Sequence, residues 1–97
     1  MTEFLFHPEA QAEFTEAVRW YQIRSARTAS RFEADLERVL KRIRKAPEMF
    51  PVYDELYRFA LLDRFPYSVV YQVQDLQLYV VAVAHSSRAP NYWRGRV

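Results

Sequence analysis

Residues 66–85, PYSVVYQVQDLQLYVVAVAH, contain the strongest strand signal in the chain. Tyrosine, valine and leucine dominate two runs within this stretch, and these residue types suit a pleated, half-buried strand. The turn-like residues QDL, at 74–76, separate the two runs. A third run, LYRFALL at residues 56–62, precedes another turn-like segment at 63–66. The pattern therefore predicts a three-stranded antiparallel meander.

Two helices are predicted before this meander. Pro8 opens the first helix, because its missing N–H costs nothing in a first turn. Ser25 interrupts the helical periodicity and can cap the second helix, which ends before Pro47. The apolar stripes are Ala10, Phe14, Ala17, Val18 and Tyr21 in the first helix and Ala29, Phe32, Leu36, Leu40 and Ile43 in the second. So short a connection predicts an antiparallel helical hairpin.

A short strand around residues 3–6 and a proline-containing loop at residues 46–55 complete the predicted elements. Their order is β-α-α-β-β-β. We expect an α+β fold in which the helical hairpin packs on one face of a mostly antiparallel four-stranded sheet. A chain of 97 residues has room for one hydrophobic core, so we expect a single domain over residues 1–97.

The amino-acid composition excludes several kinds of protein and of binding site. With 51% hydrophobic and 27% charged residues, the chain is typical of a folded globule. It has no cysteine, which excludes disulfides and thiolate metal sites, and its only imidazoles are His7 and His85. Gly95 is the only glycine, so no glycine-rich loop is present to cradle a phosphate. We therefore expect neither a cofactor nor a metal.

Two features of the hydropathy pattern bear on the cellular location of the protein. Residues 1–10, MTEFLFHPEA, lack the basic and apolar regions of a secretion signal. The longest apolar run, residues 78–84, is far too short to cross a bilayer. We expect a cytoplasmic protein with no membrane partner.

Basic residues are concentrated in two segments. Residues 38–45, RVLKRIRK, hold five basic residues and no acid. Residues 76–97 hold three arginines and no acid. Such segments suit a polyanionic or acidic partner. Cations near the end of a helix are also favoured by its macrodipole, and for residues 38–45 both interpretations stay open.

Four segments together resemble the RelE/ParE superfamily of bacterial type II toxins. They are HPEAQAEFTEAVRWY (7–21), RFEADLERVLKRIRKAPEMFP (31–51), FPYSVVYQV (65–73) and AVAHSSRAPNYW (82–93). The last segment is most similar to the ParE-like, plasmid-stabilisation branch. The resemblance implies a growth-arresting toxin encoded beside an antitoxin that wraps and neutralises it. It also implies that operator DNA is bound through the antitoxin complex.

The resemblance implies two kinds of target, because RelE-like members cut mRNA on the ribosome whereas ParE-like members inhibit DNA gyrase. RelE-like sequences carry cationic residues where this chain has Ser68, Ser86 and the acids Asp54 and Glu55. Cleavage of RNA through its 2′-hydroxyl needs cations around the pentacoordinate phosphate. The sequence therefore favours inhibition of gyrase by binding, without catalysis.

Two alternatives stay open. His85 suits proton transfer at neutral pH, and a ribosome-dependent, metal-independent endoribonuclease would use His85, Arg88 and Tyr92. The other alternative is a degenerate toxin that acts mainly in an operator-binding complex.

We expect the C-terminal segment to contact the target, because aromatic residues and arginine are enriched at binding hot spots. The expected target-binding residues are Arg58, His85, Arg88, Tyr92, Trp93 and Arg94. One aromatic of this segment should anchor it on the core while the arginines face the partner. An acidic, amphipathic antitoxin segment suits a basic surface with an aromatic neighbour. The expected antitoxin-binding residues are Trp20, Arg38, Lys41, Arg42 and Lys45.

Overall fold

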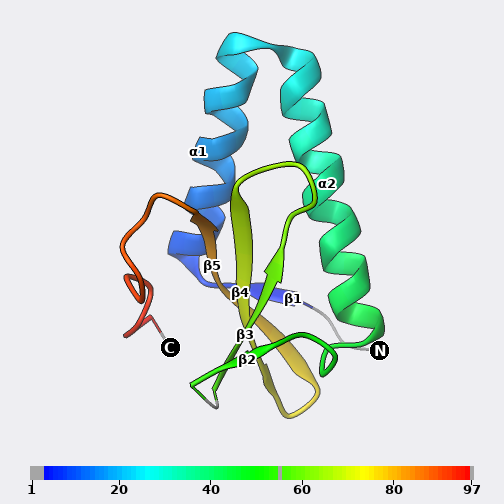
Figure 1. Cartoon of the computed structure of the whole chain (residues 1–97), viewed down its shortest axis with the longest axis vertical. Helices are drawn as coiled ribbons and strands as arrows, with labels where there is room; N and C mark the ends of the chain where they lie inside the picture. Colours follow the sequence, from blue (N-terminus) through cyan, green and yellow to red (C-terminus); the bar gives the residue numbers. More distant parts are fainter. Residues whose placement is uncertain (1–3, 55, 97) are drawn as a thin grey trace.

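The computed structural model describes residues 4–54 and 56–96 and shows a helical hairpin standing on a β-sheet (Figure 1). The helices are α1 (Pro8–Arg24) and α2 (Ala26–Lys45). The strands are β1 (Phe4–Phe6), β2 (Val52–Tyr53), β3 (Tyr57–Leu61), β4 (Tyr67–Gln74) and β5 (Gln77–His85). The predicted hairpin and meander are both confirmed. Of the predicted first strand, residue 3 lies outside the described residues.

The strands form one sheet in the order β1-β5-β4-β3-β2. Strands β3, β4 and β5 are the antiparallel meander, and β2 pairs antiparallel with β3. Strand β1 pairs with β5 in parallel, with Phe4 opposite Leu78. The prediction of four strands was wrong, since the sheet has five and is mixed. The extra strand, β2, has only 2 residues, too few to show an alternating pattern.

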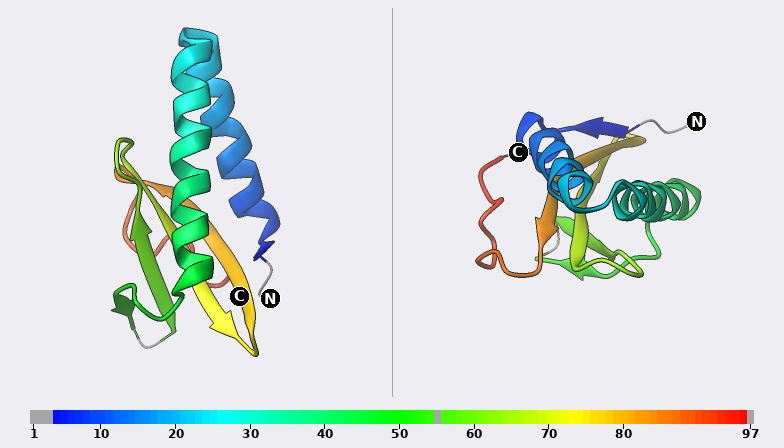
Figure 2. Two further views of the ribbon diagram at one scale, coloured as in Figure 1. Left: turned by 90° about the vertical axis from the view of Figure 1, so that its right-hand side faces the viewer. Right: turned by 90° about the horizontal axis from the view of Figure 1, so that it is seen from above.

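A single residue, Ser25, connects the two helices. Its N–H donates to the carbonyl of Tyr21 at 2.7 Å, and its Oγ accepts from the N–H of Thr28 at 3.2 Å. One serine therefore caps both helix ends, as the sequence predicts for the second helix. The tip of the hairpin projects well beyond the sheet (Figure 2). Within residues 4–54 and 56–96, neither helix combines the length and the apolar character needed to cross a membrane.

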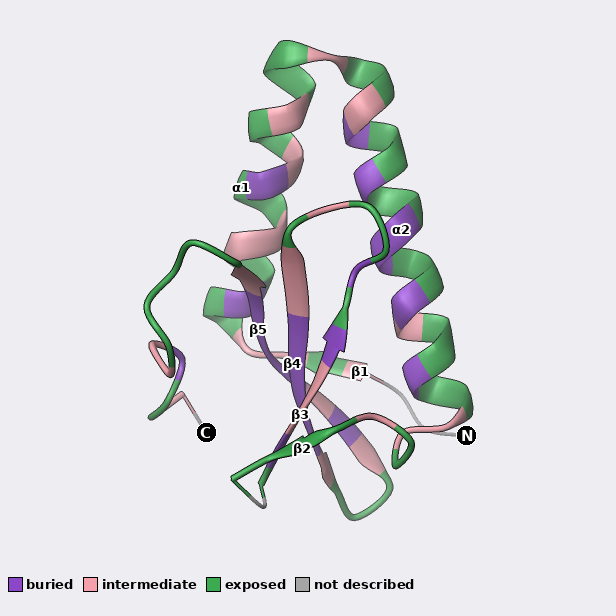
Figure 3. Ribbon diagram, in the orientation of Figure 1, coloured by how far each residue is buried: buried purple, intermediate pink, exposed green. Residues whose placement is uncertain are grey.

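The hairpin covers one face of the sheet, and both predicted apolar stripes line the core between them (Figure 3). The buried members are Ala10, Ala17, Ala29, Phe32, Leu36 and Ile43, and the partly buried members are Phe14, Val18, Tyr21 and Leu40. The opposite face carries a second, smaller core. It consists of Tyr57, Val70, Val81, Ala82 and Trp93, flanked by Phe59, Ala84 and Tyr92. Trp93 comes from the C-terminal segment, so this segment covers the face that the hairpin leaves free.

A buried carboxylate joins the hairpin to the loop between β3 and β4. Asp35 on α2 is 0% exposed. Its Oδ1 accepts from the N–H of Asp63 at 3.3 Å, and its Oδ2 accepts from the N–H of Arg64 at 2.9 Å. Arg38 donates to the same carboxylate at 3.3 Å. These bonds hold the loop against the middle of α2 and satisfy two backbone donors that no strand partner reaches.

Candidate functional site

The C-terminal segment, residues 86–96, leaves the end of β5 and runs down beside it (Figure 1). Its first turn closes where the N–H of Arg88 donates to the carbonyl of His85 at 3.0 Å. Asn91 and Gly95 then adopt φ angles of 65° and 92°. Asparagine and glycine tolerate this left-handed region best, which explains why the only glycine of the chain lies here.

Trp93 fixes this segment to the sheet. Its side chain is 2% exposed, and its ring centroid lies 4.5 Å from that of Tyr57 and 5.7 Å from that of Phe59, in edge-to-face contact. Of the two neighbouring aromatics in the segment, Trp93 is thus the anchor. Trp93 is among the expected target-binding residues; the structure shows that its ring is buried and anchors the segment.

Glu13 on α1 holds the segment from the other side. Its Oε2 accepts from the Tyr92 hydroxyl at 2.7 Å and from Arg96 at 3.0 Å. Its Oε1 accepts from Arg96 at 3.1 Å and from the N–H of Val83 at 2.9 Å. The side chains of Arg96 and Glu13 are only 10% and 13% exposed. The segment is therefore clamped between a buried indole and a largely buried ion pair.

Glu13 and Arg96 also supply hydrogen-bond partners for the free edge of β5. Strand β1 pairs with β5 only as far as Val80, so the following backbone groups lack a strand partner on that side. The N–H of Val83 donates to Glu13, and Arg96 donates to the carbonyl of Val81 at 3.0 Å. Buried backbone groups need such partners, so α1 and the C-terminal segment take the place of a missing strand.

Sequence reasoning missed both Glu13 and Arg96. A signal for Glu13 was present, because it lies three residues after Ala10 and four before Ala17, which are both buried. Helical periodicity therefore places Glu13 on the core-facing side of α1, where a charged residue needs a partner. No comparable local signal marks Arg96.

The network raises the pKa values of Tyr92 and Arg96. Burial raises the pKa of the Tyr92 hydroxyl, and the hydrogen bond that it donates to Glu13 raises this pKa further. For Arg96, burial lowers the pKa, but the hydrogen bond and the charge of Glu13 outweigh burial and the pKa is raised. Tyrosine and arginine are protonated at neutral pH even without these shifts, and the raised pKa values extend this to higher pH.

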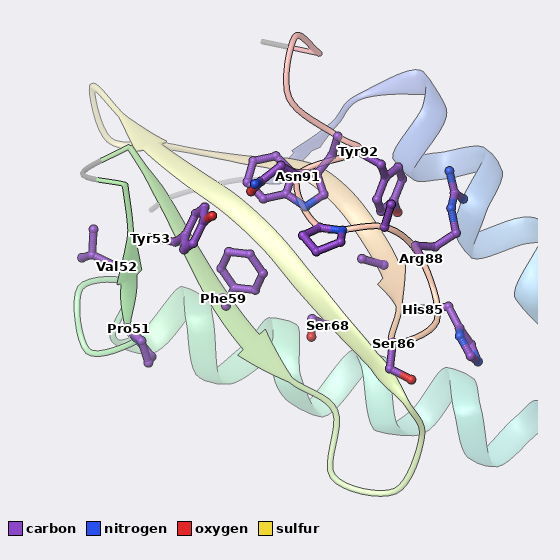
Figure 4. Close-up of a pocket in the computed structure, with 14 residues that line it drawn as sticks. Pro51, Val52, Tyr53, Phe59, Ser68, His85, Ser86, Arg88, Asn91 and Tyr92 are labelled. Carbon is purple, nitrogen blue, oxygen red and sulfur yellow. The ribbon is translucent and has the colours of Figure 1, made fainter.

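An open cavity of about 390 Å³ lies between the sheet and the C-terminal segment (Figure 4). Tyr53 and Phe59 line it from the strands, and Tyr92 lines it from the segment. Ser68 and Ser86 lie at the same cavity. The other lining residues are Pro51, Val52, Ala84, His85, Arg88, Ala89, Pro90, Asn91 and Trp93. The walls therefore include four large aromatic side chains and two prolines, and among the described residues Arg88 is their one charged residue.

A second cavity, of about 360 Å³, lies between α1 and the end of the sheet, where Trp20 and Tyr67 line it. His85 and Arg88 border both cavities. The Arg88 guanidinium lies 3.8 Å from the centroid of the Tyr92 ring, and this side chain is 51% exposed. We call His85, Arg88 and Tyr92 the rim triad, because all three line the first cavity and the first two also border the second.

His85 is the last residue of β5. Its Nδ1 accepts from the N–H of Ser87 at 3.0 Å and lies 2.8 Å from the Ser87 hydroxyl. An amide N–H only donates, so Nδ1 is the acceptor and the proton of the neutral ring is assigned to Nε2. The ring also packs edge-on against Tyr67, with 4.9 Å between centroids. In the part of the chain that the structure describes, no group of three or more metal-ligating side chains is placed to hold a metal ion.

Arg58 is not brought to the rim triad. It pairs with Tyr71 across β3 and β4, and Tyr71 belongs to the core under the hairpin. Neighbours across an antiparallel pair share a face, so Arg58 lies on the face opposite Trp93. Its guanidinium donates to the carbonyls of Glu48 and Phe50 at 3.1 and 2.7 Å. This arginine therefore stabilises the loop before β2.

Arg94 is engaged within the chain as well. It forms an ion pair with Asp54, at the turn after β2, and lies near the rings of Tyr53 and Tyr57. The pair links the C-terminal segment to the far edge of the sheet. Glu55, the next acid in the sequence, lies outside the described residues.

The expected antitoxin-binding residues lie in two places. Trp20 is 52% exposed near the tip of the hairpin, and it borders the second cavity. Arg38, Lys41, Arg42 and Lys45 lie on the C-terminal half of α2. In an antiparallel hairpin this spacing puts Trp20 about 12–23 Å from them along the helix axis.

One end of that basic group borders a third cavity, of about 320 Å³. Arg42 and Lys45 line it together with Met49 and Phe50. Met49 is 80% exposed, and Arg42 also pairs with Asp63 at 3.6 Å. Here a basic rim surrounds apolar side chains.

A protein-family model described as "ParE toxin of type II toxin-antitoxin system, parDE" matches residues 4–90. The matched range contains both helices, all the described strands and the first turn after β5. Trp93 and Arg96 lie beyond it. A comparison with curated proteins finds no match.

Proposed function

Because this chain belongs to the ParE toxin family of type II toxin–antitoxin systems, we propose that it arrests growth by binding and inhibiting DNA gyrase. A type II toxin implies an antitoxin partner. We assign the contact with gyrase to the rim triad, His85, Arg88 and Tyr92, and to the walls of the two cavities beside it.

The make-up of the larger cavity carries this proposal. Phosphoryl transfer would need cations aimed at the developing charge of the phosphate. Ser68 and Ser86 line this cavity and supply no charge. The nearby Arg96 is neutralised by Glu13. Aromatic walls with one exposed arginine instead suit the side chains of a protein partner.

The purified chain is expected to block DNA supercoiling by gyrase and to leave mRNA on stalled ribosomes intact. Both reactions are followed by gel electrophoresis over the same range of toxin concentration. Cleavage of mRNA with gyrase unaffected would overturn the proposal. A chain that inhibits neither reaction and does not arrest growth would instead support a degenerate toxin.

The second candidate is a metal-independent, ribosome-dependent endoribonuclease. It is favoured by one observation, since His85, Arg88 and Tyr92 do line a common cavity. If His85 transferred a proton, His85→Ala would lower the rate of cleavage by about 10²–10⁴-fold. Under the gyrase proposal the same variant shows only a weakened inhibition of supercoiling.

We place the antitoxin contact at the third cavity, where Arg42 and Lys45 surround Met49 and Phe50. Met49→Ala is expected to weaken binding of the antitoxin encoded beside the toxin by about tenfold or more, because apolar anchors dominate such contacts. Leu76→Ala is the matched control, since Leu76 is 85% exposed in the turn between β4 and β5. Titration calorimetry compares the two variants. Equal affinities for both would move the antitoxin contact elsewhere.

A further inference from the structure

The exposed side of α2 carries a regular row of cations, which we call the basic stripe. Its members are Arg27, Arg31, Arg38, Lys41 and Lys45, and all are exposed. They follow one another at intervals of four, seven, three and four residues, which keeps them on one side of an α-helix. At about 1.5 Å per residue the stripe is about 27 Å long. Figure 3 shows exposed surface along α2 on the side away from α1.

Little negative charge compensates the basic stripe. The acids of α2 are Glu33, Asp35 and Glu37, and none of them falls at a stripe position. Asp35 is buried and pairs with Arg38 at 3.3 Å. Over residues 4–54 and 56–96, the other four stripe cations have no carboxylate within ion-pair distance. A row of uncompensated cations along a helix is the electrostatic pattern of nucleic-acid binding.

The basic stripe lacks large apolar side chains, and this favours nucleic acid over a peptide as its partner. A peptide that orders on binding needs apolar anchors to offset its loss of entropy. None of the large apolar side chains exposed in the described residues belongs to α2. The remaining stripe position, between Arg31 and Arg38, is occupied by Ala34. Phosphate groups, in contrast, need only cations at a suitable spacing.

We propose that the basic stripe binds the phosphate backbone of duplex DNA without reading its base sequence. Duplex DNA carries one negative charge per about 1.7 Å of axis, so the stripe runs beside roughly 16 phosphate charges. The stripe contains no asparagine or glutamine to read adenine, and because arginine is able to read guanine, the comparison of two duplex sequences below tests the absence of base readout. The stripe lies on the exposed side of α2, and the tip of the hairpin projects beyond the sheet, so a duplex has access to this side of α2 (Figure 2). This surface is distinct from the rim triad and does not depend on gyrase.

The purified chain alone, without antitoxin or gyrase, is titrated against a fluorescent duplex of about 30 base pairs at salt concentrations from about 50 to about 200 mM. The four uncompensated cations predict that log K falls with log salt with a slope of about −3.6, and a contact from Arg38 as well would make the slope about −4.5. Two duplexes of unrelated sequence are expected to bind within about threefold of each other, since backbone contacts carry no sequence information. Fluorescence anisotropy measures both quantities.

Substitutions locate the contact. Lys41→Gln is expected to reduce the steepness of the slope by about 1, and Arg31→Gln/Lys41→Gln by about 2. Arg94→Gln removes the same single charge on the other face of the sheet, beside Asp54, and is expected to leave the slope unchanged. The denaturation midpoint of each variant, read by circular dichroism, confirms that the fold is intact.

Three results would overturn the proposal. The first is no binding at about 50 mM salt, where phosphate contacts are strong. The second is an equal change of slope for Lys41→Gln and Arg94→Gln, which would reflect net charge alone. The third is competition by polyglutamate as effective as by unlabelled DNA of equal charge, which would make the stripe a surface for acidic protein.

Discussion

Replacing Trp93 by alanine is expected to lower the free energy of unfolding by about 3–5 kcal/mol. The side chain is 2% exposed and lies at the centre of the second core, against Tyr57 and Phe59. A total stability of about 5–15 kcal/mol is usual for a domain, so this single change removes a large part of it. Denaturant unfolding followed by far-ultraviolet circular dichroism measures the loss.

The other tryptophan supplies a matched control. Trp20→Ala removes the same indole from a side chain that is 52% exposed, and we expect a loss below about 1 kcal/mol. Because both variants lose the same indole, the difference between their free energies of unfolding measures the effect of burial. Equal losses for the two variants would contradict the assignment of Trp93 as the anchor of the C-terminal segment.

Because Trp93 anchors the C-terminal segment, truncation is unsuitable for testing whether this segment contacts the target. A chain that ends at Ala89 lacks both Trp93 and Arg96, and Glu13 loses its close partners Arg96 and Tyr92 and keeps only Arg88, at 3.8 Å. Loss of the close partners of a largely buried charge is destabilising, and here the buried indole is lost as well. Inactivity of such a chain would report the loss of the fold rather than the loss of a contact surface. Substitutions of exposed side chains separate the two effects.

Local sequence patterns were sufficient for most of the fold. The runs around Val69 and Val81 have the composition of strands, and the stripe that contains Phe32 and Leu36 has the period of a helix, so these elements were predicted correctly. Strand β2 was missed because its pairing with β3, Val52 opposite Arg58, depends on the tertiary structure and leaves no periodicity in 2 residues.

The candidate site was predictable only in part, for the same reason. A basic, aromatic segment after His85 is visible in the sequence, and three of its expected residues meet in the rim triad. Their clamp is not visible, because Glu13 lies 79 residues from Tyr92 and 83 from Arg96. Arg58 was misplaced because the carbonyls that bind it belong to a loop whose path no local pattern specifies.

Replacing Arg88 by alanine is expected to abolish growth arrest and leave the fold intact. The side chain is 51% exposed, and its ion pair with Glu13, at 3.8 Å, contributes at most about 1 kcal/mol to stability. At a contact with a partner, an exposed arginine that stacks on Tyr92 is typical of a hot spot. Loss of such a residue costs about 2 kcal/mol or more in binding, or roughly thirtyfold in affinity.

Growth arrest after induction, the gyrase inhibition curve and the denaturation midpoint are measured for Arg88→Ala, Arg88→Lys and Arg64→Ala. Arg88→Lys keeps the charge but loses the planar group that stacks on Tyr92, so we expect it to recover little activity. Arg64→Ala removes an exposed arginine from the loop between β3 and β4 and should arrest growth fully. If Arg88→Ala arrests growth as well as Arg64→Ala does, the rim triad is not the target contact. The hairpin tip then becomes the surface to test, because Trp20 and Ile23 are 52% and 75% exposed there beside Arg24.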